Sequence, residues 1–104
     1  MTDFKNLDLT YKAIDSFASF NKTQKLVLKS LIKLNIDGVS VVSIKDLCSL
    51  SGVTNTPVSN ALLKLEEEGV ISDISRRGVV FTGCRVKESK ISEIIERYKI
   101  KHQL

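Results

Sequence analysis

The sequence predicts a mainly α fold with a small β-hairpin (α+β), in which five helical segments accompany one short pair of strands. Apolar residues recur at helical spacing through most of the chain, and only residues 70–86 read as two strands around a turn. The 104 residues are enough for one hydrophobic core but too few for a second. We therefore treat residues 1–104 as a single domain.

The composition is that of an ordinary soluble globular protein, with 42% apolar and 27% charged residues. No apolar run approaches the roughly 18–20 residues needed to cross a bilayer, and the amino terminus lacks the basic and apolar regions of a signal peptide. We therefore expect a cytoplasmic protein that makes no use of a membrane. The formal net charge of +4 leans towards a polyanionic partner but does not decide the matter.

Two helices are predicted in the amino-terminal third. The first spans residues 8–19, and its apolar face is formed by Leu7, Tyr11, Ile14 and Ala18. The second spans about 22–35 and begins with a capping-box arrangement, in which Asn21 stands three residues before Gln24. Its core-facing residues are Val27, Leu28, Leu31 and Leu34.

A strand stub at residues 39–42 and a pair of helices follow. Ser43 marks the start of a helix over about 44–51, which Gly52 ends. The next helix spans 55–68, with Thr54 in position to cap it. Its inward face is formed by Val58, Ala61, Leu62 and Leu65.

The carboxy-terminal part reads as a hairpin and a final helix. Residues 70–75 and 79–86 are predicted strands around Arg76-Arg77-Gly78. Residues 88–102 return to a helical pattern, with an apolar stripe made of Ile91, Ile94, Ile95 and Tyr98. This stripe must be buried, either against the chain's own core or against a second copy.

A short helix, a glycine turn, a second helix and a hairpin in succession resemble the winged helix-turn-helix family of DNA-binding proteins, most closely its MarR-like and ArsR-like bacterial regulators. The resemblance covers roughly residues 24–86. It rests on Ile44-Lys45-Asp46-Leu47, Ser51-Gly52-Val53-Thr54, Val58-Ser59, Leu62, Leu65-Glu66-Glu67-Glu68-Gly69-Val70-Ile71 and the Arg76-Arg77-Gly78 wing. It implies a winged helix-turn-helix core over about 22–86, flanked by helices over about 8–19 and 88–102.

In such a fold the helix over 55–68 lies in the major groove, and its first residues meet base edges. Its outward side chains are small, polar and uncharged, whereas a helix that serves solubility alone normally carries Lys and Glu there. These side chains are Asn55, Thr56, Ser59 and Asn60. Asn pairs bidentately with adenine, and Ser or Thr meets either donor or acceptor edges. The plainer interpretation is that they only cap and solvate a surface helix.

Cationic residues complete the predicted DNA-binding set. Lys64 is expected to reach phosphate, and the wing over 75–79 carries Arg76 and Arg77 to a minor groove or to the backbone. Lys45 is a weaker candidate for contact with the DNA backbone, as are Lys22, Lys25 and Lys29.

We find no pattern of an enzyme or of a metal site, and we expect no catalysis, no metal and no cofactor. The chain has no paired-carboxylate motif, Gly-rich phosphate loop or nucleophile elbow. Cys48, Cys84 and His102 are scattered without ligand spacing. Ligand or redox control through either cysteine stays open at this point, although a buried cysteine usually serves as a small hydrophobe.

The sequence is thus interpreted as a sequence-specific double-stranded DNA-binding protein, a small transcriptional regulator that forms a homodimer through its terminal helices. A plasmid or phage replication or partition factor is an alternative that uses the same domain. A second alternative is a winged-helix adaptor that binds another protein without DNA contact. Leu63, an apolar residue on the would-be recognition face, is a slight indication of the adaptor.

Overall fold

The computed structural model describes residues 7–103, which form five helices and a four-stranded antiparallel sheet. The helices are α1 (Leu7–Asp15), α2 (Lys22–Lys33), α3 (Ile44–Ser51), α4 (Asn55–Glu67) and α5 (Glu88–His102). The strands are β1 (Asn35–Ile36), β2 (Val39–Val41), β3 (Ile71–Arg77) and β4 (Val80–Val86). This is the α+β fold that the sequence predicts. Residues 1–6, on which the expectation about a signal peptide partly depends, lie outside the described residues.

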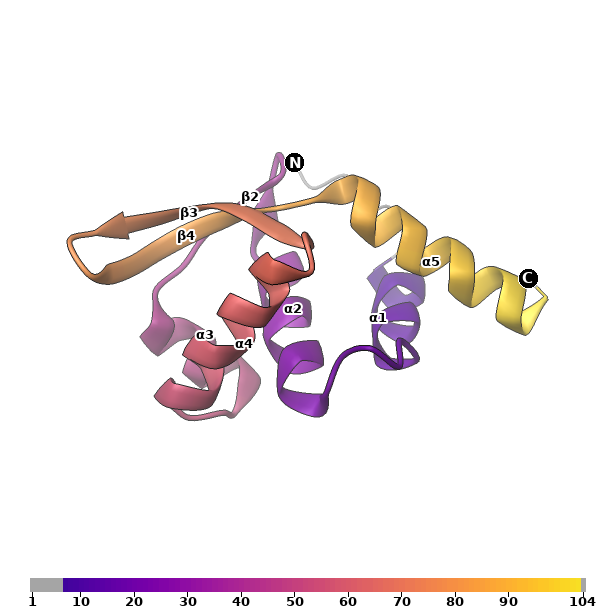
Figure 1. The fold of residues 1–104 in the computed structure, drawn as a ribbon, viewed down its shortest axis with the longest axis horizontal. Coiled ribbons are helices and arrows are strands. Elements are labelled where there is room, and N and C mark those ends of the chain that lie inside the picture. The colour runs from indigo at the N-terminus through magenta and orange to yellow at the C-terminus, as the bar shows by residue number, and fades with distance from the viewer. Residues whose placement is uncertain (1–6, 104) are drawn as a thin grey trace.

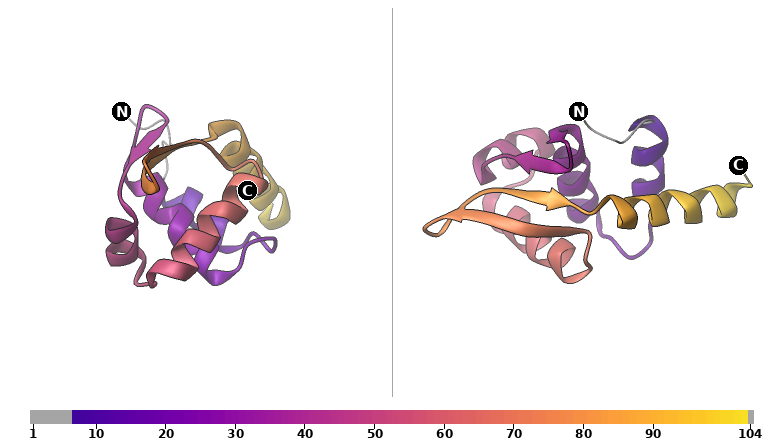
Figure 2. Two further views of the ribbon diagram at one scale, coloured as in Figure 1. Left: turned by 60° about the vertical axis from the view of Figure 1, so that its left-hand side comes forward. Right: turned by 90° about the horizontal axis from the view of Figure 1, so that it is seen from above.

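Helices α2, α3 and α4 form a group beneath the sheet, and the β3–β4 hairpin, called the wing from here on, extends past this group on one side (Figure 1). The strand order is β1-β2-β4-β3, so β2 lies between β1 and the wing. Strand β4 leads into α5, which runs away on the opposite side and packs against α1 (Figure 2). The layout is compatible with a winged helix-turn-helix flanked by two terminal helices.

One hydrophobic core joins all five helices to the sheet. Its fully buried members include Ile14 of α1, Leu28 of α2, Leu47 of α3, Leu65 of α4 and Ile91 of α5. Each such side chain stabilises the fold by about 1.5–3 kcal/mol relative to leaving it in water. In the predicted α5 stripe, Ile91 and Ile94 are buried in the chain's own core, whereas Ile95 and Tyr98 are half-buried.

Helix α1 ends at Asp15, so the prediction that it continues to residue 19 is wrong. The chain turns inward after Asp15, because Phe17 and Phe20 pack edge to face with ring centroids 4.9 Å apart. Lys25 of α2 donates its Nζ hydrogen bond to the Asp15 carbonyl oxygen at 2.6 Å, and Lys29 pairs with the Asp15 carboxylate at 2.8 Å. These contacts from a neighbouring helix satisfy the end of α1, and a local apolar pattern does not reveal them.

Helix α2 ends at Lys33 rather than at residue 35, because the following residues turn back as strand β1. The buried Asn35 side chain accepts a hydrogen bond from the Gly38 N–H at 3.0 Å and donates one to Ser40 Oγ at 3.3 Å. Ser40 Oγ in turn donates to the Leu31 carbonyl oxygen at 2.7 Å. This buried polar network ties the β1–β2 turn to α2.

The α3–α4 pair follows the predicted boundaries closely. Ser43 caps α3 by accepting a hydrogen bond from the Asp46 N–H at 3.1 Å, and Gly52 ends the helix with a left-handed φ of 73°. Thr54 occupies the N-cap position of α4, but its side chain makes no capping hydrogen bond. The predicted inward face of α4 is confirmed, because its buried residues are Val58, Ala61, Leu62 and Leu65.

The turn of the wing is shorter than predicted. Arg76 and Arg77 belong to β3, where they pair with Phe81 and Val80, and only residues 78–79 form the turn. The prediction that Arg76-Arg77-Gly78 form the tip, in a wing over 75–79, is therefore corrected. The ladder with β4 continues through Arg77, so β3 ends at the residue directly before Gly78.

Strand β4 lies close against β2 at Gly83, whose φ is 153° and which pairs with Val41. A Cβ atom at this position would lie 2.5 Å from the Ser40 carbonyl oxygen. Only glycine allows this approach. The contact holds the base of the wing against the helical part.

Asn21 and Gln24 form the predicted capping box, with the Gln24 N–H donating to Asn21 Oδ1 at 2.8 Å and the Asn21 N–H donating to Gln24 Oε1 at 3.0 Å. Asn21→Ala is expected to lower the free energy of unfolding by about 1 kcal/mol, because one first-turn N–H of α2 loses its acceptor. Urea unfolding measures this change.

Thr54→Ala is the matched control, since Thr54 holds the same position in α4 without the side-chain hydrogen bond. It is expected to cost less than the Asn21 variant. Equal losses in the two variants would show that the capping box contributes nothing of its own.

Cys84 is buried in the core, and Cys48 is half-buried. Burial raises the pKa of the Cys84 thiol from 9.0 to about 12, and the Glu66 carboxylate adds to the rise. Because the thiolate is the reactive form, Cys84 is expected to react with iodoacetamide about tenfold or more slowly than Cys48 in the native protein. Mass spectrometry of timed samples measures the two rates, and unfolding in urea should abolish the difference.

The same pKa shift fixes a pH dependence of stability. The pKa of the Cys84 thiol is 9.0 in the unfolded chain and about 12 in the folded one. The neutral thiol therefore contributes fully to the free energy of unfolding below pH 9, and this contribution is lost as the pH rises towards 12. Cys84→Ala is expected to remove this loss of stability at alkaline pH. If urea unfolding gave the variant and the parent the same dependence of stability on pH, the assignment to Cys84 would be contradicted.

Candidate nucleic-acid interface

Helix α4 presents the predicted polar residues on the side opposite its buried face. Asn55, Thr56 and Asn60 are exposed and Ser59 is half-buried. At about 100° per residue, the four positions span an arc of about 140°. The buried side packs against α2 and α3, which fixes the direction in which the arc faces.

The two edges of this arc meet different neighbours. Asn55 and Ser59 line a groove of about 390 Å³ between α4 and the wing, called the α4–wing groove below. Asn60 instead lines a shallow hollow beside the first turn of α2. Thr56 lies between the two edges and faces open solvent.

Arg76 brings a positive charge into the α4–wing groove, together with the polar side chains of Asn55 and Ser59. It is the one ionic group among the residues that line the groove, so no carboxylate opposes it there. The rest of the lining is apolar. Its most exposed members are Leu63, Val79 and Val80.

Arg77 does not join Arg76, although the two are adjacent in sequence. Successive side chains of a strand point to opposite faces, and both residues are regularly paired with β4. Arg77 is accordingly not among the residues that line the α4–wing groove, although its partner on β4, Val80, is one of them. Both arginines are exposed, and neither forms an ion pair with any residue in the range 7–103.

The predicted lysines are placed less uniformly. Lys45 is exposed on α3, whereas Lys64 is half-buried with its Nζ 3.8 Å from Glu68 Oε2. Such a partly exposed i,i+4 pair is worth only a few tenths of a kcal/mol, so it leaves Lys64 available to another anion. Among the weaker candidates, Lys25 and Lys29 contact Asp15.

Three apolar residues of the groove were not assigned to the site from the sequence. The sequence indicates Leu63 only as an apolar exception on the polar face, and it places Val79 and Val80 only within a predicted strand. Val79, at the turn of the wing, is 95% exposed. Apolar residues beside a short turn are the one signal in the sequence that could have revealed them, because a turn tip has no core to enter.

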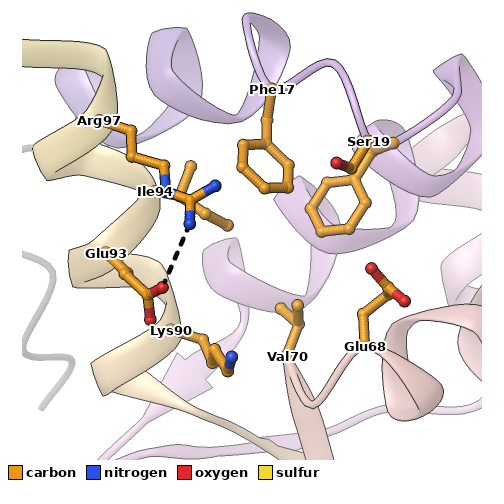
Figure 3. A pocket seen from close by; sticks show the side chains of 9 residues that line it. Phe17, Ser19, Glu68, Val70, Lys90, Glu93, Ile94 and Arg97 are labelled. Carbon is orange, nitrogen blue, oxygen red and sulfur yellow. Dashed lines mark ion pairs between the residues drawn. The ribbon is translucent and has the colours of Figure 1, made fainter.

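A second hollow, of about 200 Å³, lies at the other end of α4, between α5 and the α1–α2 loop (Figure 3). Aromatic side chains of Phe17 and Phe20 form part of its wall. Charged groups of both signs surround it: Glu68, Lys90, Glu93 and Arg97. Glu93 and Arg97 form an ion pair at 3.6 Å, so the hollow offers no concentrated charge of one sign.

Within residues 7–103, no group of three or more His, Cys, Asp or Glu side chains is arranged to hold a metal ion. In the same range, no helix combines the length and apolar character that a membrane-spanning segment needs. The buried polar side chains of residues 7–103 all have hydrogen-bond partners. No unsatisfied buried group therefore marks a site elsewhere in the described part of the chain.

Comparison with known protein families finds no family model that matches this chain, and comparison with curated proteins finds no match either. The resemblance to winged helix-turn-helix regulators therefore rests on the residues of the motif and on the layout of the fold.

Proposed function

We propose that this protein is a sequence-specific double-stranded DNA-binding protein with a winged helix-turn-helix domain, acting as a small transcriptional regulator in the cytoplasm. In this proposal α4 lies in the major groove and the wing contacts the minor groove or the backbone. The observation that carries it is the outward face of α4, where uncharged polar side chains border a groove whose one ionic group is Arg76.

The polar face suits direct reading of bases. Asn55 and Asn60 are exposed amides that suit bidentate pairing with adenine, and Thr56 and Ser59 offer hydroxyls that meet donors or acceptors. All four side chains are short, which lets the helix backbone approach the groove floor. Long Lys or Glu side chains at these positions would hold the helix away.

The cations suit positioning of the duplex. Because Arg76 and Arg77 leave opposite faces of the wing, their guanidinium groups can grip phosphates on both sides of it. Lys45 and Lys64 extend the positive surface along α3 and α4. The protein acts by binding alone in this proposal, without catalysis or a cofactor.

We also propose a homodimer formed through the terminal helices. Helix α5 extends away from the helical group (Figure 1), and its stripe leaves Ile95 and Tyr98 half-buried. Association of two copies along this stripe would complete the burial of those side chains. The two α4 helices of such a dimer would then bind the two halves of a palindromic site, about 34 Å apart.

The apolar members of the α4–wing groove favour one other candidate, a winged-helix adaptor that binds a protein partner there. Exposed apolar surface on a monomer often marks a protein contact. A replication or partition factor would use the same DNA-binding surface as a regulator, and the genomic position of the bound site separates the two.

Selection of bound fragments from a random duplex library, at near-physiological salt, is expected to enrich one motif. The double variant Asn55→Ala/Asn60→Ala should relax the preference at the affected positions, because each bidentate contact discriminates by about 1–3 kcal/mol. The double variant Arg76→Ala/Arg77→Ala should instead weaken binding of all sequences. It should also make the decrease of log affinity with log salt concentration less steep, by the amount expected for about two lost phosphate contacts.

Lys33→Ala/Lys87→Ala serves as the control, because it also removes two positive charges, from residues that do not line the α4–wing groove. It should change affinity far less than the arginine variant. If no motif is enriched and all binding disappears with salt, α4 does not read bases and the adaptor becomes the better proposal.

The dimer is tested by analytical ultracentrifugation. The parent protein should sediment at twice its mass of 11.6 kDa, and Tyr98→Glu should weaken association about tenfold or more, because a charge enters the buried stripe. Ile100→Glu is the matched control, since Ile100 is 73% exposed and lies on the other side of α5. A parent protein that is monomeric at every concentration would exclude the proposed dimer.

A further inference from the structure

Leu63 is an exposed apolar residue in the middle of the polar face of α4. It follows Ser59 by one helical turn and Thr56 by two, so these three side chains lie along the same side of the helix. Its side chain is 51% exposed, whereas the neighbouring Leu62 is 4% exposed and belongs to the core. Leu63 therefore contributes little to the packing of its own chain.

The surroundings of Leu63 combine apolar and polar character in a defined way. Leu63 lines the α4–wing groove together with Val79 and Val80, beside the polar groups of Asn55, Ser59 and Arg76. No carboxylate is among the lining residues, and the formal net charge of the protein is +4. A partner that contacts the α4 side of this groove must offer apolar contact, hydrogen-bonding groups and negative charge together.

The major groove of DNA offers all three. Phosphates supply the negative charge, base edges supply donors and acceptors, and the C5 methyl of thymine is the apolar group on its floor. We infer that Leu63 contacts the C5 methyl of a thymine, and that it thereby specifies thymine at one position of the bound site. This inference rests on the proposed function, in which α4 occupies the major groove.

The geometry of α4 limits where this thymine lies. At a rise of about 1.5 Å per residue, Leu63 is about 6 Å further along the helix than Ser59. This length corresponds to about two base-pair steps of about 3.4 Å. The thymine is therefore within about two base pairs of the base that Ser59 meets.

The test replaces each thymine of the selected duplex in turn by deoxyuridine, which removes the methyl group and keeps the base-pairing edge. Binding of the full chain is measured for the parent and for Leu63→Ala. At one thymine the parent should lose about fourfold in affinity, which is the contribution of one buried methyl group. Leu63→Ala should bind the unmodified duplex more weakly and should not respond to deoxyuridine at that position.

Leu50→Ala is the matched control, because Leu50 is 44% exposed on α3 and lies outside the α4–wing groove. It should keep the parent's response to deoxyuridine at every position. Circular dichroism of the three proteins checks that the helices are retained, which is expected since neither leucine belongs to the buried core.

Several results would overturn the inference while leaving the proposed function intact. They are a motif without thymine near the bases read by α4, a parent protein that is insensitive to deoxyuridine, and a Leu63→Ala protein that keeps the parent's sensitivity. A Leu63→Ala protein with unchanged DNA affinity has the same consequence and favours a protein partner in the groove. If the parent enriches no motif at all, the proposed function fails and the inference fails with it.

Discussion

The side chains of Val58, Leu62 and Leu65 hold α4 against the rest of the helical group, and the candidate interface depends on this contact. Since these residues are buried on one side of the helix, the positions on its opposite side must face outward. The orientation of Asn55 and Ser59 is thus set by packing on the opposite side of the same helix. Loss of the inward contacts would leave the polar face without a fixed direction.

The wing is placed by a second set of contacts at its base. Gly83 brings β4 against β2, and the buried Ser40 hydroxyl joins β2 to the end of α2 through the Leu31 carbonyl. The wing therefore extends from the sheet as a continuation of packed structure rather than as a free loop (Figure 2). This anchoring positions Arg76 beside the amino-terminal half of α4, where the α4–wing groove forms.

Features that depend on neighbours in sequence were predictable. The capping box at Asn21, the end of α3 at Gly52 and the inward face of α4 each follow from spacing along a single helix or turn. Predictions failed where a contact from a distant segment decides the outcome. Helix α1 stops at Asp15, where the chain turns so that Phe17 packs on Phe20 and the α2 lysines bind the helix end. Arg76 and Arg77 are strand residues because β4 extends the ladder to the turn.

The sequence by itself determined which residues belong to the polar face of α4, because helical periodicity separates Asn55, Thr56, Ser59 and Asn60 from the core positions. Only the tertiary structure decided how that face is divided. It placed Asn60 beside α2 and placed Leu63 in a groove with the wing tip. It also directed Arg76 and Arg77 to opposite faces of one strand. The physical reason is that periodicity describes one helix at a time, whereas a groove exists only between elements whose relative position is set by long-range packing and strand register.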